Sequence, residues 1–295
     1  MCLRELASHR HLLTLEQINW LLVKMLHDTV IRMRKVHTYG IVGGGVMAGV
    51  LFSLIRRADP KSRIVVRVRD AKKVAAWKRR GAIVMLNDEV FPPVDIMLLA
   101  VKPKDFSTVE ITVSMSTLVI SVMAGVSVAT MRKKLRVRKI VRMMTNIAAE
   151  HGAGLAVWHG PSIDAAGRRL VRAICQAAGQ AREVMREADI DRATVILGSG
   201  PAFLLRTLND LTEAACRIGL STQNAAQMAH SAFAAAEMLS TKESNTKRLI
   251  ERIASKGGTT EAGLMVFKKA KTSAVWDAAV RIAYARTEAL RKNAQ

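Results

Sequence analysis

A glycine-rich turn near the start of the chain constrains the fold more than any other feature of the sequence. It reads IVGGGVMAGV, in which Gly43, Gly45 and Ala48 have the spacing G-x-G-x-x-A. An apolar run ending at Val42 precedes the turn, and a helical pattern beginning at Val46 follows it. A glycine-rich turn alone could also interrupt a buried strand, but the order strand, turn, helix indicates a dinucleotide-binding βαβ unit.

Each small residue of this turn has a physical role in such a unit. Gly43 permits the tight turn, Gly45 lets the backbone approach a pyrophosphate, and Ala48 lets the helix pack on the strand. The N-terminus of the helix offers free N–H groups and a partial positive charge to the phosphates. We therefore expect a dinucleotide to bind at this turn.

Short apolar runs alternate with helical patterns from Thr38 to about Met185, as parallel βαβ units do. Continuous apolar strands indicate a sheet that is covered on both faces. The predicted strands are 39–42, 64–68, 83–85, 95–101, 118–123, 139–144, 155–158 and 181–185, and the predicted helices among them are 46–57, 72–80 and 164–178.

Beyond about residue 186 the chain has no convincing strand pattern and is rich in residues that favour helix. The predicted fold is thus α/β, with a Rossmann-like N-terminal domain (37–186) whose sheet is mostly parallel, followed by an all-α domain (187–295). The alanine-rich faces of this second domain allow helices to approach closely, and we expect some of them to contact a second subunit. Residues 1–36 form an N-terminal extension to which we assign no chemistry.

Composition narrows the classes of function. The net charge is +22, but aromatic residues are only 4% and do not interleave with the basic runs, so we expect no specific nucleic-acid recognition. There is no apolar run long enough to cross a bilayer. Three dispersed cysteines exclude a disulfide framework and suit the reducing cytoplasm, and the histidine spacing predicts no metal site. Acidic residues in the extension argue against a transit peptide, although organellar import through it is not excluded.

The end of the second predicted strand bears on which dinucleotide is bound. Side chains alternate between the two faces of a strand, so Arg67 and Arg69 are expected to point to the same face. Lys72 and Lys73 follow them in the sequence. Cations there favour the 2′-phosphate of NADPH, whereas an acid would accept the ribose hydroxyls of NADH. Asp70 keeps NADH possible, unless its carboxylate caps the next helix.

Three further segments suggest binding sites. Lys102 and Pro103 end the fourth predicted strand, where ligands bind in open α/β sheets, and Asn146 ends a later strand beside the same cleft. In the helical domain, Ser255–Glu261 is a glycine turn that opens a helix, and its backbone N–H groups suit a substrate carboxylate.

Six blocks occur in an order that resembles the Δ1-pyrroline-5-carboxylate reductase family: IVGGGVMAGV, LLAVKPK, ISVMAGVS, VRMMTNIAA, LGSGPAF and ASKGGTTEAGL. The resemblance spans roughly residues 38–292, and the last two blocks are quite specific. It implies an NAD(P)H-dependent oxidoreductase of proline biosynthesis that transfers a hydride to the carbon of a cyclic imino acid. It also implies a homodimer, or a higher homo-oligomer, formed through the helical domain.

The resemblance assigns roles to individual residues. Thr260 is implied as the catalytic residue, with its hydroxyl near the ring nitrogen of the substrate. The implied substrate-binding residues are Ser255, Gly257, Gly258, Thr259 and Thr260. The implied cofactor-binding residues are Gly43, Gly45, Val46, Met47, Ala48, Arg69, Asn87, Ala100, Val101, Lys102, Pro103, Ala124, Gly125 and Asn146.

The chain departs from the family pattern at three places. Val46 replaces an asparagine, the block usually reading MPNTPA is MTNIAA, and Lys256 replaces a proline. Two alternatives therefore stay open: a related reductase of another imine or of a β-hydroxyacid, and a non-catalytic protein that binds NADP(H). For the β-hydroxyacid enzyme, Lys242 and Lys256 would be the candidate acids, but their surroundings do not match that motif.

Overall fold

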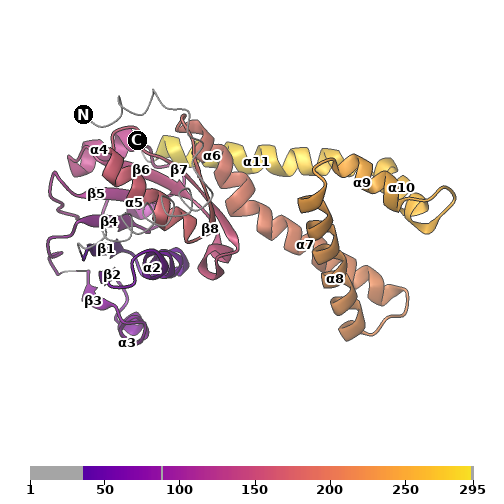
Figure 1. The fold of residues 1–295 in the computed structure, drawn as a ribbon, viewed down its shortest axis with the longest axis horizontal. Helices are drawn as coiled ribbons and strands as arrows, with labels where there is room; N and C mark the ends of the chain where they lie inside the picture. Colours follow the sequence, from indigo (N-terminus) through magenta and orange to yellow (C-terminus); the bar gives the residue numbers. More distant parts are fainter. Residues whose placement is uncertain (1–35, 88, 294–295) are drawn as a thin grey trace, which may run out of the picture.

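The computed structural model describes residues 36–87 and 89–293, which form an eight-stranded sheet and a helical region that extends away from it (Figure 1). The strands are β1 (Thr38–Val42), β2 (Arg63–Val68), β3 (Ile83–Leu86), β4 (Ile96–Leu99), β5 (Leu118–Ser121), β6 (Ile140–Met144), β7 (Gly154–His159) and β8 (Gly179–Glu183). Their order is β3-β2-β1-β4-β5-β6-β7-β8. The strands β1 to β6 are parallel, β7 runs antiparallel to β6, and β8 is parallel to β7. The predicted, mostly parallel sheet is confirmed, while the predicted N-terminal extension lies outside the described residues except for its last position.

Helices cover both faces of this sheet because successive strand residues point to opposite sides. Ile41 packs into one core with α2 (Val46–Ala58) and α5 (Ala165–Gln176), and Trp77 of α3 (Val74–Arg79) joins the same core. Val42 points to the other face, where α4 (Val128–Leu135) supplies Met131 and Leu135. Short helical turns follow three of the strands, namely η1 (Ala71–Lys73), η2 (Pro103–Asp105) and η3 (Ile147–His151).

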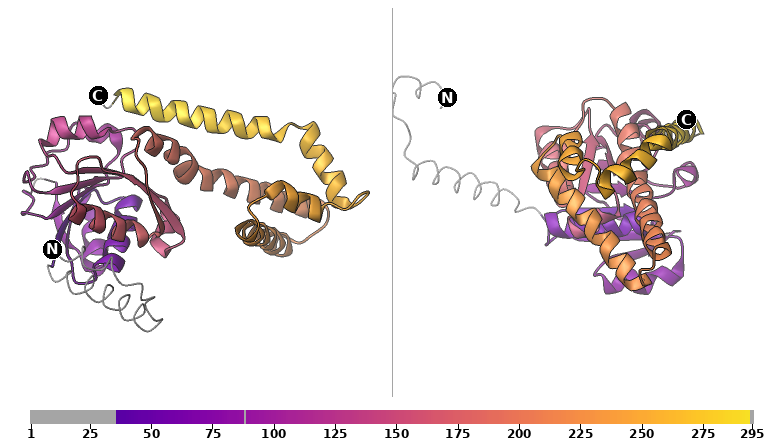
Figure 2. Two further views of the ribbon diagram at one scale, coloured as in Figure 1. Left: turned by 45° about the horizontal axis from the view of Figure 1, so that its top comes forward. Right: turned by 90° about the vertical axis from the view of Figure 1, so that its right-hand side faces the viewer.

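The chain continues as helices only, from α6 (Ala188–Ala193) and the π-helical turn η4 (Thr194–Ser199) into an extended arm. We call this the helical arm, and it comprises α7 (Gly200–Arg217), α8 (Thr222–Lys242), α9 (Thr246–Ile253), α10 (Thr259–Lys269) and α11 (Thr272–Asn293). The arm leads away from the sheet through α7, and α11 returns along its length, so that the C-terminus lies beside the sheet domain (Figures 1 and 2).

The helical arm exposes much of its apolar surface in the single chain. No residue of α7 or α10 is buried, and Leu205, Met265 and Phe267 are largely exposed. Most helical stability in proteins comes from packing an apolar face, and these apolar side chains are left uncovered by the described part of the chain. Among the described residues, no helix is both long enough and apolar enough to cross a membrane.

Candidate active site

The loops that carry the predicted cofactor-binding residues lie at one edge of the sheet. Because β1 to β6 are parallel, their carboxyl ends meet at the same edge. Each predicted residue follows one of these strands: the glycine turn follows β1, Arg69 follows β2, Asn87 follows β3, Ala100–Pro103 follow β4, Ala124 and Gly125 follow β5, and Asn146 follows β6. The strand order reverses between β1 and β4, which is where open α/β sheets bind their ligands.

Gly43 brings the loops after β1 and β4 into contact at this reversal. Its φ angle is +114°, and a Cβ atom there would lie 2.7 Å from the carbonyl oxygen of Ala100. Its N–H donates to the carbonyl of Arg67 at 3.0 Å. Only glycine fits both the positive φ angle and the close approach.

Gly45 leaves the N-terminus of α2 open. It is the N-cap residue of the helix, and no atom lies within 4 Å of the position that a Cβ would take. The first intrahelical bond of α2 comes from the N–H of Gly49, so the N–H groups of Val46, Met47 and Ala48 have no acceptor within the helix. The free donors and the open space beside Gly45 together suit an anion at the start of α2.

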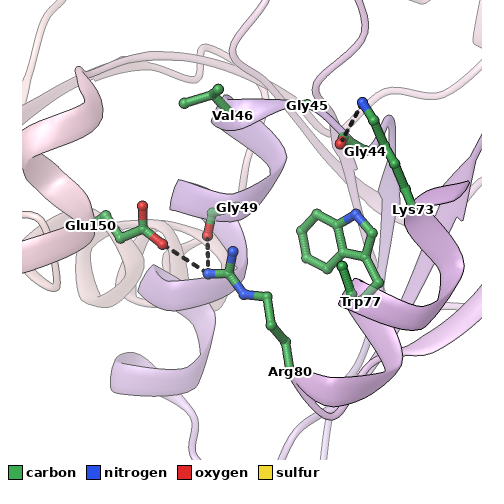
Figure 3. A pocket seen from close by; sticks show the side chains of 9 residues that line it. Gly44, Gly45, Val46, Gly49, Lys73, Trp77, Arg80 and Glu150 are labelled. Carbon is green, nitrogen blue, oxygen red and sulfur yellow. Dashed lines mark hydrogen bonds and ion pairs between the residues drawn. The ribbon is translucent and has the colours of Figure 1, made fainter.

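The remaining residues of the turn divide between the core and the surface. Ala48 is fully buried, and Met47 packs against the same core. The side chain of Val46 is 68% exposed and borders a cavity of about 330 Å³ between α2 and α3 (Figure 3). Trp77, Lys73, Arg80 and Glu150 also line this cavity.

The cations after β2 have different surroundings. Arg67, which the sequence groups with Arg69 as a phosphate-binding cation, is buried and donates to the carbonyl of Glu110 at 2.7 Å, and burial lowers its pKa. It is not available to a phosphate, so that expectation is wrong. Arg69 is 82% exposed, and Nζ of Lys73 lies 3.2 Å from the carbonyl oxygen of Gly44 in the glycine turn (Figure 3).

Asp70 acts as a helix cap. Its carboxylate accepts a hydrogen bond from the N–H of Lys72 at 3.0 Å, and Asp70 is the N-cap residue of η1. The alternative that this acid caps the following helix is confirmed. Lys73, Arg80 and Glu150 are the charged groups that line the cavity beside the turn. The guanidinium of Arg69 lies 3.8 Å from the carboxylate of Asp105.

The loops after β4 and β5 complete the edge. The N–H of Ala100 donates to the carbonyl of Val42 at 2.9 Å, while Val101 lies half-buried and the exposed Lys102 precedes Pro103 at the start of η2. Ala124 is half-buried beside Gly125, whose φ angle is +73°.

The altered MTNIAA block after β6 is held by several hydrogen bonds. The hydroxyl of the buried Thr145 donates to the carbonyl of Leu155 at 3.0 Å. The carboxamide of Asn146 accepts from the N–H of Ala148 at 3.1 Å and caps η3. The guanidinium of Arg57 donates to the carbonyls of Ala149 and Glu150. These contacts anchor the loop, which lacks the two prolines of the family pattern.

The predicted substrate-binding turn lies far from this edge in the same chain. Ser255–Thr260 connects α9 to α10 near the distal end of the helical arm (Figure 1). Gly257 has a φ angle of +72°, and its N–H donates to the carboxylate of Glu261 at 2.6 Å. The N–H of Gly258 donates to the carbonyl of Ser255 at 3.0 Å.

The N–H groups at the start of α10 are therefore the donors left for an anion. The helix begins at Thr259, and the first N–H groups of a helix have no acceptor within it. Thr260 is half-buried, whereas Lys256 and Thr259 are exposed. The described part of the chain holds no cluster of His, Cys, Asp and Glu side chains that could bind a metal ion.

Comparisons with known proteins relate both parts of this site to one enzyme family. Residues 187–290 match a family model described as pyrroline-5-carboxylate reductase dimerisation, and residues 38–125 match one described as NADP oxidoreductase, coenzyme F420-dependent. A pyrroline-5-carboxylate reductase of Synechocystis is 31% identical over 86% of this chain and 98% of its own length. One from Aquifex aeolicus is 30% identical over 81% of this chain and 90% of its own. The structure of a pyrroline-5-carboxylate reductase from Coxiella burnetii, 26% identical, covers 87% of this chain and 99% of its own with a TM-score of 0.73.

Proposed function

The chain belongs to the pyrroline-5-carboxylate reductase family, and from this premise we propose how its residues carry out the reaction. The reaction is the NAD(P)H-dependent reduction of Δ1-pyrroline-5-carboxylate to L-proline, the last step of proline biosynthesis. The observation that carries the proposal is the open N-terminus of α2 behind Gly45, at the point where the strand order reverses.

The residues at this edge fit a nicotinamide dinucleotide. The space next to Gly45, which a Cβ would enter, accepts a pyrophosphate, and the free N–H groups of Val46 and Met47 bind it. The loops of Ala100–Pro103, Ala124, Gly125 and Asn146 lie towards β5 and β6 and would contact the nicotinamide half. When bound, the reduced cofactor supplies the hydride.

NADPH is the preferred cofactor in this account. Nζ of Lys73 lies at the glycine turn, and Arg69 is exposed just after β2, with the carboxylate of Asp105 3.8 Å away. We propose that both cations pair with a 2′-phosphate. The carboxylate of Asp70 is engaged as a helix cap, so it is poorly placed to hold the two ribose hydroxyls of NADH.

Replacing Lys73 with methionine is expected to raise the KM for NADPH about fivefold, which corresponds to about 1 kcal/mol for a partly exposed charged contact. The KM for NADH should change less than twofold, because NADH has no 2′-phosphate. Lys78→Met, an exposed lysine on the next helix, is the matched control. Equal changes for both cofactors would contradict the assignment of Lys73.

The substrate turn binds the imino acid through its carboxylate. We place the carboxylate at the N–H groups of Thr259 and Thr260, where the partial positive charge of the α10 N-terminus also lies. The hydroxyl of Thr260 forms a hydrogen bond with the ring nitrogen of the imine. A protonated imine is already electrophilic, so the enzyme mainly aligns the two reactants and excludes water.

Because the two halves of the site lie at opposite ends of one chain (Figure 1), we propose that two copies complete it. The dimerisation match over residues 187–290 indicates a homo-oligomer, and the exposed apolar residues of α7 and α10 supply a surface for its contact. In the proposed homodimer, the substrate turn of each copy lies over the cofactor edge of the other.

Turnover distinguishes this function from its alternatives. Purified protein, NADPH and Δ1-pyrroline-5-carboxylate are mixed, and the absorbance of the reduced nicotinamide and the proline formed are both measured. We expect one proline for each NADPH oxidised. Turnover only with another imine or a β-hydroxyacid would indicate a different substrate, and cofactor binding without any turnover would indicate a non-catalytic protein. We also propose a cytoplasmic location, which suits the free thiols of Cys175 and Cys216.

A further inference from the structure

A cluster of four charged residues with a buried central pair joins the sheet domain to the helices that follow it. Arg142 of β6 is 1% exposed, and its guanidinium contacts two carboxylates of the helical region. The distances are 3.0 Å to Oε1 of Glu187 and 2.6 Å to Oδ1 of Asp191. Asp191, which is 4% exposed, also lies 3.7 Å from the guanidinium of Arg291 near the end of α11.

These contacts tie the first and last helices of the helical region to the same strand. Glu187 precedes α6, Asp191 lies within α6, and Arg291 belongs to α11. Oε1 of Glu187 also accepts the N–H of Val128 at 2.7 Å, at the start of α4. The cluster thereby connects β6, α4, α6 and α11, elements that are far apart in the sequence.

The same elements border the proposed cofactor edge. β6 continues directly into Thr145 and Asn146. A Cβ at Gly125, in the loop after β5, would lie 2.9 Å from the backbone nitrogen of Arg291, so the end of α11 packs on that loop. A shift of α6 or α11 would therefore change both this loop and the direction in which the helical arm leaves the sheet.

A cluster of buried charges contributes little to the free energy of unfolding compared with apolar residues in the same place. Burying charges costs desolvation energy, and apolar residues of similar volume often stabilise a fold equally well or better. The Nε atom of Arg142 has no hydrogen-bond partner among the described residues, so the cluster is not fully satisfied. What the cluster provides is a defined direction, because the planar guanidinium of Arg142 donates one N–H to each of two carboxylates and so fixes where both lie.

We infer that Arg142, Glu187, Asp191 and Arg291 form a charged joint that fixes the angle of the helical arm relative to the cofactor edge. Arg142 and Asp191 are thus positioning residues for the hydride transfer. The inference rests on the proposed function, since in the dimer the angle of the arm decides where its substrate turn meets the other copy. A small misplacement of two reactants is costly, because the rate depends steeply on their alignment.

The test replaces the central pair with apolar residues of similar size, as Arg142→Met together with Asp191→Leu. This removes the directional contacts without leaving a fully buried charge, because the remaining Glu187 is 31% exposed and keeps the N–H of Val128. We expect the midpoint of thermal unfolding and the KM for NADPH to stay near their wild-type values, while kcat falls at least fivefold. A role in stability alone predicts the reverse, with a lower unfolding temperature and an unchanged kcat in the folded fraction.

Two further variants keep the test decisive. Arg291→Gln removes the outer partner of Asp191, which is 40% exposed, and is expected to lower kcat by about twofold. This variant can be measured whether or not the double variant folds. Arg192→Gln is the matched control, because Arg192 lies on α6 next to Asp191 and is 55% exposed. Among the described residues it pairs with Asp189, outside the cluster. An unchanged kcat in the folded double variant, or in Arg291→Gln if the double variant does not fold, would overturn the inference. Wild-type turnover is measured separately, so a failure of the proposed reaction is distinguished from a failure of the joint.

Discussion

Replacing Gly43 with valine is expected to weaken NADPH binding at least a hundredfold. The φ angle of +114° at this residue is one that β-branched side chains do not adopt. A Cβ would also lie 2.7 Å from the carbonyl oxygen of Ala100, so the turn must move away from the loop after β4. Strain and displacement together cost a few kcal/mol, and the pyrophosphate loses its donors. The quantity to measure is the Kd for NADPH, by calorimetry or by fluorescence of the reduced nicotinamide.

Gly81 supplies the control for this variant. Its φ angle is +83°, but the nearest atom to a Cβ there is the flexible end of Arg56 at 3.9 Å. Gly81→Val therefore carries a similar backbone strain in the same domain without the collision at the cofactor edge. We expect it to lower stability and to leave the Kd for NADPH within about threefold of wild type, on the scale of ordinary context effects. A Gly43→Val protein that binds NADPH normally would remove the turn from the cofactor site.

Replacing Thr260 with alanine is expected to lower kcat/KM for the imino acid between about tenfold and a hundredfold. This is the scale of one hydrogen bond to a charged group, about 1.5–3 kcal/mol. The Kd for NADPH should change less than twofold, because the hydroxyl of Thr260 is assigned to the ring nitrogen of the imino acid and not to the cofactor. Steady-state kinetics with varied imino acid, at saturating NADPH, measures the effect.

Thr260→Ser is the matched variant because it keeps the hydroxyl and removes only a methyl group. We expect it to recover most of the activity that the alanine variant loses. If the alanine and serine variants have the same kcat/KM, the hydroxyl of Thr260 takes no part in the reaction. If Thr260→Ala also weakens NADPH binding, the loss of kcat/KM would instead indicate a general disturbance of the fold.

Local patterns in the sequence are sufficient to predict the sheet and the glycine turn. Continuous apolar strands and a helix after Gly45 depend on residues within about ten positions of each other, and the observed β1, β2 and α2 begin within one residue of the predicted limits. The chemistry of the turn, with a positive φ angle at Gly43, also follows from local residue types.

Long-range partners are what the sequence alone does not reveal. Arg67 and Arg142 both look like single cations within apolar strands, and the sequence could only assign Arg67 by alternation. Its burial depends on Phe91, which lies between β3 and β4, and on Glu110, which lies after β4. Both are more than twenty residues away. Nothing near Arg142 in the sequence indicates its buried ion pairs, because its partners Glu187 and Asp191 lie 45 and 49 residues further along the chain.

The separation of the two half-sites is likewise invisible in the order of motifs. The cofactor turn and the substrate turn both match their expected local structures, yet α7 to α9 carry the second one away from the first (Figure 2). Only the three-dimensional path of the helical arm shows that one chain does not bring Gly45 and Thr260 together.

Mixed dimers of two inactive variants test most directly whether two copies build the active site. Gly43→Val lacks a working cofactor turn and Thr260→Ala lacks a working substrate turn, so each homodimer should have little activity. When the two are dissociated together and reassembled, half of the dimers are mixed, and each mixed dimer regains one complete site. The account predicts recovery of about a quarter of the wild-type kcat for random pairing in a two-fold dimer. No recovery in demonstrably mixed dimers would show that each chain completes its own site and would contradict the account.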